Sequence, residues 1–444
     1  MFGQVKILGI SPNADAMIAS GGRISTMDGT ANEIYEKSLA AGSEKNEKLI
    51  GKVLSSGHTS VLEHGYINLS FENVSVLAEQ FLIEFRLASF TVKSRRYVDF
   101  SKAGYVRPAL LGEAGQIFDE AVCALFGIYD TLEAAGVPRE DARFVLPYCF
   151  CSNFFCSMNA RELGHVMNEL CYGRGSDIPE FRALGESLFA QCEERLPFLA
   201  IRKPEQYRKE KPALPAGKAL CADAPVTLLA STGEPEKLIC RAAYLARGMD
   251  MPELTAQAQK EIISALLQSP RRRELEQASF TLLYDGMSLS ALTHLTRHRM
   301  QSLVAPELLE NSDYARFVLP QSVVDCGVKA AYQKAFSLAR AAAEKLKALG
   351  AGKDALSYLL LSGMQVPVVS TMNAGELCTF FRLRTCTRAQ WEIRALATEA
   401  LTVLRAAHPV LFSLYGPTCF MTGRCPEGKM CCGKQLEMWE KFSL

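Results

Sequence analysis

The chain has 444 residues, a formal net charge of +1, and hydrophobic and charged fractions of 48% and 22%. This length is enough for two or three domains with complete cores, and the composition is that of a soluble globular protein. The nearly neutral charge provides no overall basic field for nucleic acid or an anionic membrane. No apolar run approaches the ~18 residues of a membrane-spanning helix.

The N-terminal segment and the cysteines together predict a cytoplasmic protein. The first residues, MFGQVKILGISPNADAM, lack a basic segment followed by an apolar one, so no secretory signal is expected. The 15 cysteines are an odd number, and most stand singly in apolar segments, as do Cys149, Cys151 and Cys156. This usage is typical of reduced, buried thiols rather than of a disulfide framework.

The chain opens with a β-branched segment at 5–8, which predicts a short strand, followed by a segment with helical spacing of apolar residues. Alternation at 66–71 predicts a second strand, and a helix then leads to Glu84-Phe85-Arg86. The rest of this half is expected to be mainly helical. Prolines and basic residues at 202–224 predict a polar linker.

The same order of elements returns after the linker. Strands are predicted at 226–229 and 279–284, and a helix leads to Arg297-His298-Arg299. A long apolar-periodic segment at 390–407 predicts a further helix.

Matching motifs in the two halves indicate an internal duplication. Ser157-Met158-Asn159-Ala160 returns as Thr371-Met372-Asn373-Ala374, and the matched segments keep their order at offsets of 213 to 221 residues. We therefore expect one copy at 1–222 and a second at 223–444, which ends in a cysteine-rich tail at 416–434. The predicted class is α+β, with a small, mainly antiparallel sheet packed with several long helices in each copy.

Several motifs resemble those of flavin-dependent thymidylate synthases. In the first copy they are the segment GHTSVLEH at 57–64 and Ser94-Arg95-Arg96-Tyr97, and in the second copy Arg297-His298-Arg299 and the segment RAQWEIR at 388–394. The resemblance covers nearly the whole chain, twice. It implies an enzyme that methylates dUMP reductively to dTMP, with methylenetetrahydrofolate and NADPH as co-substrates and FAD as cofactor.

Neither copy keeps every element of this family. The hallmark Arg-His of the second copy corresponds to Glu84-Phe85 in the first, and the catalytic arginine that falls on Arg384 corresponds to Leu170. Conversely, the nucleotide-binding arginine falls on Arg143 in the first copy, and the second copy has Ala355-Leu356-Ser357 there. Because these losses do not overlap, we expect one active site to draw on both copies.

The resemblance also implies a role for each site residue. Arg384 is the expected catalytic residue, placed against the uracil ring. The residues expected to bind dUMP are Ser94, Arg95, Arg96, Arg143, His294, Arg297 and Arg384. The residues expected to bind FAD are Ser60, Glu63, Asn159, Arg161, His165, Arg297, His298, Arg299 and Arg388. Guanidinium groups suit phosphate because they donate parallel, charge-assisted hydrogen bonds.

No metal is predicted in this site. His294 and His298 lie one helical turn apart, as zinc-binding histidines can, but no third ligand has the usual spacing. The tail is a separate case, because Cys419, Cys425, Cys431 and Cys432 lie close together in it. They could bind zinc or an iron–sulfur cluster, but the absence of a paired Cys-x-x-Cys favours free or redox-labile thiols.

The expected assembly is a homodimer. The family places its active sites between the subunits of a homotetramer, so two fused chains would form a pseudo-tetramer of domains. The expected partners are dUMP and folate, with no nucleic acid and no membrane. The alternative is a catalytically decayed paralogue that binds flavin or nucleotide and has a regulatory or assembly role.

Overall fold

The computed structural model describes residues 2–207, 214–215, 224–307 and 313–443. They form two compact units, of which unit 1 comprises residues 1–216 and 320–362 and unit 2 comprises residues 217–319 and 363–444. The segment 320–362 thus packs with unit 1, although the sequence repeat assigns it to the second copy. The predicted copy boundary at residue 222 and most of the predicted linker at 202–224 lie outside the described residues.

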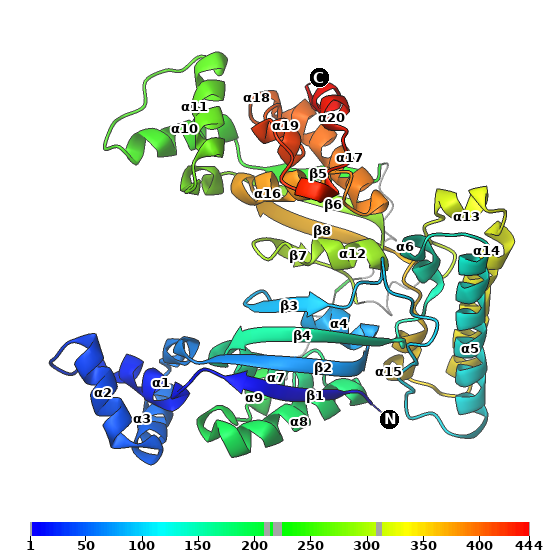
Figure 1. Cartoon of the computed structure of the whole chain (residues 1–444), viewed down its shortest axis with the longest axis horizontal. Coiled ribbons are helices and arrows are strands. Elements are labelled where there is room, and N and C mark those ends of the chain that lie inside the picture. Colours follow the sequence, from blue (N-terminus) through cyan, green and yellow to red (C-terminus); the bar gives the residue numbers. More distant parts are fainter. Residues whose placement is uncertain (1, 208–213, 216–223, 308–312, 444) are drawn as a thin grey trace. The chain divides into compact units, whose positions relative to one another are not determined.

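Each unit contains one four-stranded antiparallel sheet, and the two sheets have the same strand order, β1-β2-β4-β3 and β5-β6-β8-β7 (Figure 1). The strands of unit 1 are β1 (Gln4–Ile10), β2 (Tyr66–Ser75), β3 (Ala88–Val92) and β4 (Cys151–Asn159). Those of unit 2 are β5 (Val226–Ser231), β6 (Ser279–Ser288), β7 (Ser302–Val304) and β8 (Gln365–Asn373). The predicted α+β class with two repeated domains is confirmed.

The third and fourth strands of each sheet, β4 and β3 in unit 1 and β8 and β7 in unit 2, were not predicted. The sequence analysis found β1, β2, β5 and β6 but assigned the second part of each copy mainly to helices. In unit 1 the strand β4 reads CSNFFCSMN. Serine, asparagine and cysteine carry little strand preference of their own, so the pairing of β4 with both β2 and β3 decides its conformation.

The two sheets also share an irregularity. The pairing of β2 with β4 shifts register between Phe71 and Val74, and that of β6 with β8 shifts between Tyr284 and Met287. A left-handed residue lies in each interruption, Asn73 with φ 53° and Gly286 with φ 82°. Because a bulge of this kind needs a residue that tolerates positive φ, the repeated bulge supports the duplication independently of the motifs.

Several helices of unit 1 lie at one end of its sheet, and the remaining ones pack elsewhere around it (Figure 1). At one end of the sheet lie α1 (Ala14–Arg23), α2 (Ala31–Ala41), α3 (Ser43–Ser55) and the 3₁₀ helix η1 (Thr59–His64). The others are α4 (Val76–Leu82), α5 (Gly112–Ala134), α6 (Arg139–Ala142), η2 (Arg143–Val145), α7 (Ala160–Cys171), α8 (Pro179–Arg195), η3 (Pro197–Leu199), α9 (Pro204–Tyr207), α13 (Gln321–Asp325), α14 (Lys329–Ala348), α15 (Lys353–Leu356) and η5 (Ser357–Leu359).

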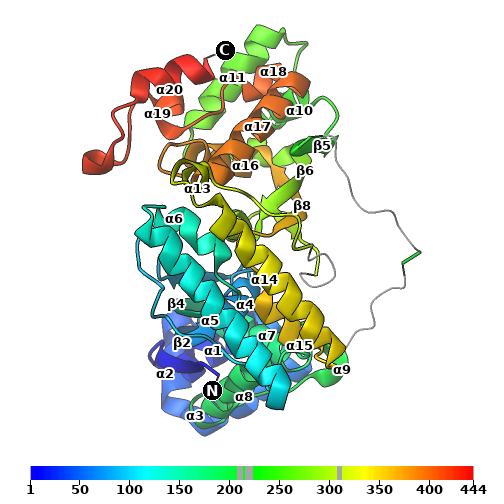
Figure 2. The same cartoon turned by 90° about the vertical axis from the view of Figure 1, so that its right-hand side faces the viewer.

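The segment from the second repeat is built into the core of unit 1. Helix α14 lies alongside α5 and buries Tyr332 and Phe336 (Figure 2). Tyr148 N donates to Leu360 O at 2.8 Å, which joins the two repeats through the backbone. The buried Glu180 carboxylate accepts from the Ser75 hydroxyl at 2.6 Å and from the Tyr358 hydroxyl at 2.8 Å. Unit 1 therefore needs residues from both halves of the chain.

The helices of unit 2 pack with its sheet, and the last three belong to the C-terminal end of the chain (Figure 1). They are α10 (Pro235–Leu245), α11 (Ala256–Gln268), η4 (Arg273–Gln277), α12 (Leu289–Leu295), α16 (Ala374–Arg384), α17 (Trp391–Ala407), α18 (Pro409–Phe412), α19 (Thr418–Thr422), η6 (Gly428–Met430) and α20 (Gln435–Phe442). The helix predicted at 390–407 is α17. Among the described helices, none combines the length and apolar character needed to span a membrane.

Candidate active site

The Arg-His-Arg segment of unit 2 lies in the turn between α12 and β7. Ser288 caps α12, and its backbone N–H and hydroxyl donate to the two carboxylate oxygens of Glu392 at 2.7 and 2.5 Å. Glu392 belongs to the first turn of α17, which directly follows the segment carrying Arg384 and Arg388. The start of α12 and the start of α17 are thus fixed to each other by a buried carboxylate.

A chain of three polar side chains connects this turn to α16. His298 Nδ1 lies 3.2 Å from Glu376 Oε1, and Arg384 Nε donates to His298 Nε2 at 2.9 Å. Arg384 Nη2 also donates to the backbone carbonyl of His294 at 3.1 Å. The structure therefore brings together the expected catalytic Arg384 and the expected ligand residues His294 and His298.

The surroundings of His298 favour the neutral imidazole. Burial lowers the pKa of His298 below its ordinary 6.5, and the Arg384 charge lowers it further, although the hydrogen bond with Glu376 raises it. With Nε2 accepting from Arg384, Nδ1 carries the proton and donates it to Glu376. The imidazole thus fixes the Arg384 guanidinium on one side and is itself fixed by a carboxylate on the other.

Other expected residues of unit 2 lie around this chain. Arg297 and Arg299 flank the buried His298, and their side chains are exposed. Arg388 is half-buried in the segment between α16 and α17. Arg394 Nη1 donates to the carbonyl of Thr387 at 2.9 Å and holds that segment in place. Arg297, Arg299 and Arg388 are thus exposed or half-exposed residues in the two segments that carry His298 and follow Arg384.

In unit 1, the residues expected to bind phosphate meet around α6. Arg96 forms an ion pair with Glu140, and the Nε of the buried Arg143 donates to the carbonyl of Glu140 at 2.9 Å. The Ser94 hydroxyl accepts from Arg96 N at 3.3 Å. Ser94, Arg96 and Arg143 are thus assembled at one place.

The Arg95 side chain has a different position. It is buried and forms an ion pair with Glu79, which also accepts from the Ser152 hydroxyl at 2.5 Å. Because this guanidinium is already committed to a buried carboxylate, Arg95 can contribute its backbone N–H to an anion, whereas its side chain anchors the loop.

The residues of unit 1 expected to bind FAD lie on η1 and at the start of α7. Glu63 Oε1 is 2.6 Å from Arg161 Nη1, and the Asn159 side chain caps α7 by accepting from Glu162 N at 2.9 Å. His165 is exposed on the same helix, with Nδ1 2.9 Å from the Tyr207 hydroxyl. Ser60 is exposed on η1.

Comparison with known proteins matches both parts of the chain to one family. The family model described as "Thymidylate synthase complementing protein" matches residues 6–198 and again residues 227–410. The chain belongs to this family. Two similar proteins are named flavin-dependent thymidylate synthase, one from Geobacter sulfurreducens (34% identical, covering 49% of this chain and 97% of the relative) and one from Clostridium tetani (32% identical, covering 48% and 94%).

A third relative, from Sulfurisphaera tokodaii, has the same name and is 33% identical over 44% of this chain and 79% of its own length. Each of these relatives thus matches slightly less than half of this chain, and the family model matches the chain twice.

The two family copies differ most at the polar chain. The position of His298 is taken in unit 1 by the buried Phe85, whose ring lies edge-on to His165 at 5.4 Å. The position of Arg384 is taken by the buried Leu170. Glu84 is paired with Arg174 at 3.0 Å, and burial raises its pKa although Arg174 lowers it. The positions in unit 1 that correspond to His298 and Arg384 are thus apolar and buried, with the Glu84 carboxylate beside them.

No role was predicted from the sequence for four carboxylates that hold the candidate site residues in position. Glu376 orients His298, Glu392 holds the start of α12, Glu140 holds Arg96, and Glu79 holds Arg95. A signal was available for Glu376, because the repeated Asn-Ala-x-Glu at 159–162 and 373–376 is a helix N-terminus in both copies. Glu392 also lies within the motif at 388–394. Glu140 and Glu79 are single carboxylates on helices, and only their partners in space distinguish them from surface residues.

Proposed function

We propose that the chain is a flavin-dependent thymidylate synthase that converts dUMP to dTMP. In the net reaction, methylenetetrahydrofolate supplies one carbon and NADPH the reducing equivalents, so that a methyl group replaces the hydrogen at C5 of the uracil. Tetrahydrofolate and NADP⁺ are the other products. The observation that carries this proposal is the Glu376–His298–Arg384 chain, which holds a guanidinium in a defined orientation at the family's catalytic position.

The proposed role of Arg384 is electrostatic. A guanidinium beside the N3/O4 edge of uracil stabilises negative charge that develops on the ring, and a preorganised cation is worth most where water is excluded. Because His298 is neutral, it accepts a hydrogen bond from Arg384 without repelling the guanidinium charge, as an imidazolium would. His294 and Arg297 would contact the nucleotide from the same turn.

The proposed phosphate site consists of Ser94, Arg96, Arg143 and the backbone N–H of Arg95. Arg96 and Arg143 both contact Glu140, so a bound phosphate would compete with the Glu140 carboxylate for Arg96. Competition of this kind favours a dianion, because its two charges offset the cost of separating Arg96 from its present partner.

The residues of both copies fit a flavin dinucleotide. Arg297, Arg299 and Arg388 supply cations suited to a diphosphate, and Ser60, Glu63, Asn159, Arg161 and His165 supply donors and acceptors for the rest of the cofactor. Both ring nitrogens of His298 are engaged by Glu376 and Arg384, so this residue would orient Arg384 rather than bind the cofactor directly. When bound, FAD would supply the hydride transfer that none of these side chains can perform.

We further propose that one active site draws on both copies and that the working form is a cytoplasmic homodimer. Support comes from the complementary losses, since unit 1 has Phe85 and Leu170 where unit 2 keeps His298 and Arg384. The phosphate-binding and flavin-binding candidates of unit 1 have no counterpart of His298 or Arg384 in their own copy, so they would need those of unit 2.

The test is anaerobic incubation of the intact protein with dUMP, methylenetetrahydrofolate, FAD and NADPH, with dTMP quantified by chromatography. Formation of dTMP that depends on every component is the expected result. If NADPH reduces bound flavin but no dTMP forms over long incubation, the chain is a decayed paralogue with a binding or regulatory role, and the proposal fails.

A further inference from the structure

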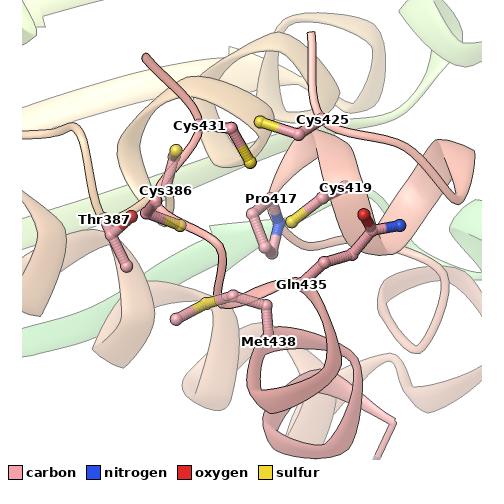
Figure 3. Close-up of a pocket in the computed structure, with 9 residues that line it drawn as sticks. Cys386, Thr387, Pro417, Cys419, Cys425, Cys431, Gln435 and Met438 are labelled. Atoms are coloured by element: carbon pink, nitrogen blue, oxygen red, sulfur yellow. The ribbon is translucent and has the colours of Figure 1, made fainter. Parts of the chain in front are cut away.

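The C-terminal tail holds a group of thiols outside the proposed active site. Cys419, Cys425, Cys431 and Cys432 of the tail meet Cys386, which lies 33 residues before the first of them, in the segment between α16 and α17. All five line one small pocket together with Pro417 and Met438. Figure 3 shows the side chains of Cys386, Cys419, Cys425 and Cys431 around the space beside Pro417. We call these five cysteines the thiol pocket.

The tail has almost no hydrophobic core of its own. From residue 418 to residue 443, Phe442 is the one buried residue, and Leu436 and Trp439 are 70% and 56% exposed. Short helices with so little buried apolar surface usually need a covalent or metal cross-link to hold one structure.

The tail is held at both ends and has few contacts between them. Arg405 donates to the backbone carbonyls of Tyr415 and Phe442 at 2.8 Å each. Gln268 donates to the Met421 carbonyl at 3.4 Å, but η6 buries no residue, and the thiol pocket joins this part of the tail to Cys386. A cross-link would act at this point.

The thiols are close enough to affect one another. Cys386, Cys419, Cys425, Cys431 and Cys432 all line the same small pocket, so their sulfur atoms lie near one another. A bound divalent cation would let several of them act as thiolate ligands at once.

We propose that the thiol pocket is a tetrathiolate metal site that takes zinc. Cys386, Cys419 and Cys425 supply three ligands, and the fourth comes from the adjacent pair Cys431 and Cys432. Four sulfur ligands are the usual set of a closed structural zinc site. Cys386 supplies the ligand from outside the tail that the tail sequence by itself lacks.

Binding requires the sulfur atoms to turn inward. Among the described residues, no three His, Cys, Asp or Glu side chains are already arranged around one point as metal ligands. Rotation about the side-chain bonds is open to these cysteines because Cys386, Cys419 and Cys425 are half-exposed and Cys431 and Cys432 are exposed. The bound ion would also restrain the segment that follows Arg384, since Cys386 is two residues from it.

The experiment measures metal in the intact protein, purified anaerobically under reducing conditions without added metal. We expect about one zinc ion per chain, measured by inductively coupled plasma mass spectrometry. Cys386→Ser, Cys419→Ser and Cys425→Ser should each lose the metal, whereas Cys326→Ser, which changes a half-exposed thiol of unit 1, should retain it. One of Cys431→Ser and Cys432→Ser should retain it and the other lose it. This result does not depend on thymidylate synthase activity.

A second measurement uses the wild-type chain, so it does not depend on whether the cysteine variants fold. After removal of the metal, Co²⁺ added to the wild-type chain should give the strong visible bands of a tetrahedral cobalt thiolate. Iron and acid-labile sulfide lost in the same variants would support the thiolate site with an iron–sulfur cluster as its occupant. Absence of bound metal and of cobalt bands in the folded protein, or a disulfide mapped between these cysteines after anaerobic purification, would overturn the proposal.

Discussion

Arg384 Nε donates a 2.9 Å hydrogen bond to His298 Nε2, and this bond joins the end of α16 to the turn after α12. The two residues are 86 positions apart, and each belongs to a motif that is prominent in the sequence. Glu376 completes the arrangement from the first turn of the helix that carries Arg384.

The substitution His298→Phe introduces the residue that unit 1 has at the equivalent position. The ring can still pack edge-on against Phe380, as His298 does at 5.1 Å, but Arg384 loses its acceptor and Glu376 its donor. We expect kcat for dTMP formation to fall at least ~100-fold, and the free energy of unfolding to fall by about 1–3 kcal/mol. Steady-state kinetics and denaturant unfolding measure the two effects.

The matched control for this change is Phe85→Leu in unit 1. It alters the equivalent buried position, which has no polar partner to lose, and should leave kcat within about twofold despite a packing cost of about 1 kcal/mol. Equal losses of turnover in the two variants would contradict the assignment of chemistry to unit 2.

The titration of His298 predicts how stability changes with pH. Because burial and Arg384 lower the pKa of His298 below 6.5, the unfolded chain binds a proton at this residue at a higher pH than the folded chain does. The free energy of unfolding should therefore fall as the pH decreases below 6.5, by at most about 1.4 kcal/mol per pH unit. Above that pH, His298 contributes no slope.

Denaturant unfolding of the wild type and of His298→Gln between about pH 7.5 and pH 5.5 isolates this contribution. The variant lacks the titrating group and should lose less stability over the range. Parallel curves for the two proteins would show that His298 is not held neutral.

Tyr358→Phe removes a hydrogen bond between the two repeats. Tyr358 belongs to the second repeat by sequence, and its hydroxyl donates to the buried Glu180 at 2.8 Å in unit 1. Glu180 would keep only its bonds from Ser75, so we expect the free energy of unfolding to fall by about 1–3 kcal/mol.

Tyr284→Phe is the matched control, because the Tyr284 hydroxyl is buried and has no hydrogen-bond partner among the described residues. Its removal should be neutral or slightly stabilising. A Tyr358→Phe variant as stable as Tyr284→Phe would mean that the contact with Glu180 contributes nothing.

The packing of segment 320–362 with unit 1 predicts how fragments of the chain behave. A fragment of residues 1–222 lacks α14 and therefore exposes the α5 surface that Tyr332 and Phe336 cover in the intact chain. We expect this fragment to be insoluble alone and to become soluble when residues 223–444 are co-expressed. A soluble, cooperatively unfolding fragment 1–222 would show that unit 1 does not need the segment.

The division of residues between copies predicts the flavin stoichiometry. The second potential site has Glu84 where a phosphate-binding cation is expected, and this carboxylate is already paired with Arg174. We expect titration to give about one FAD and one dUMP per chain, and light scattering to give twice the chain mass of 48.8 kDa. Two flavins per chain would show that the Glu84 position still accepts the cofactor.

The sequence by itself determined the duplication, the family and the residues that carry charge at the proposed site. Periodicity found β1, β2 and α17 because their apolar residues follow the strand and helix repeats. Resemblance to the family's motifs identified Arg297-His298-Arg299 and Arg384 as candidate site residues.

Only the tertiary structure decided the partners of those residues. Nothing in the sequence indicates that Glu376 faces His298, that Arg95 is committed to Glu79, or that Cys386 joins the thiols of the tail. Nor does the sequence indicate that segment 320–362 packs with unit 1, because α14 would show the same apolar periodicity against either unit. A pattern along one chain defines which face of a helix is buried, whereas the surface that buries it is set by packing between segments far apart in the sequence.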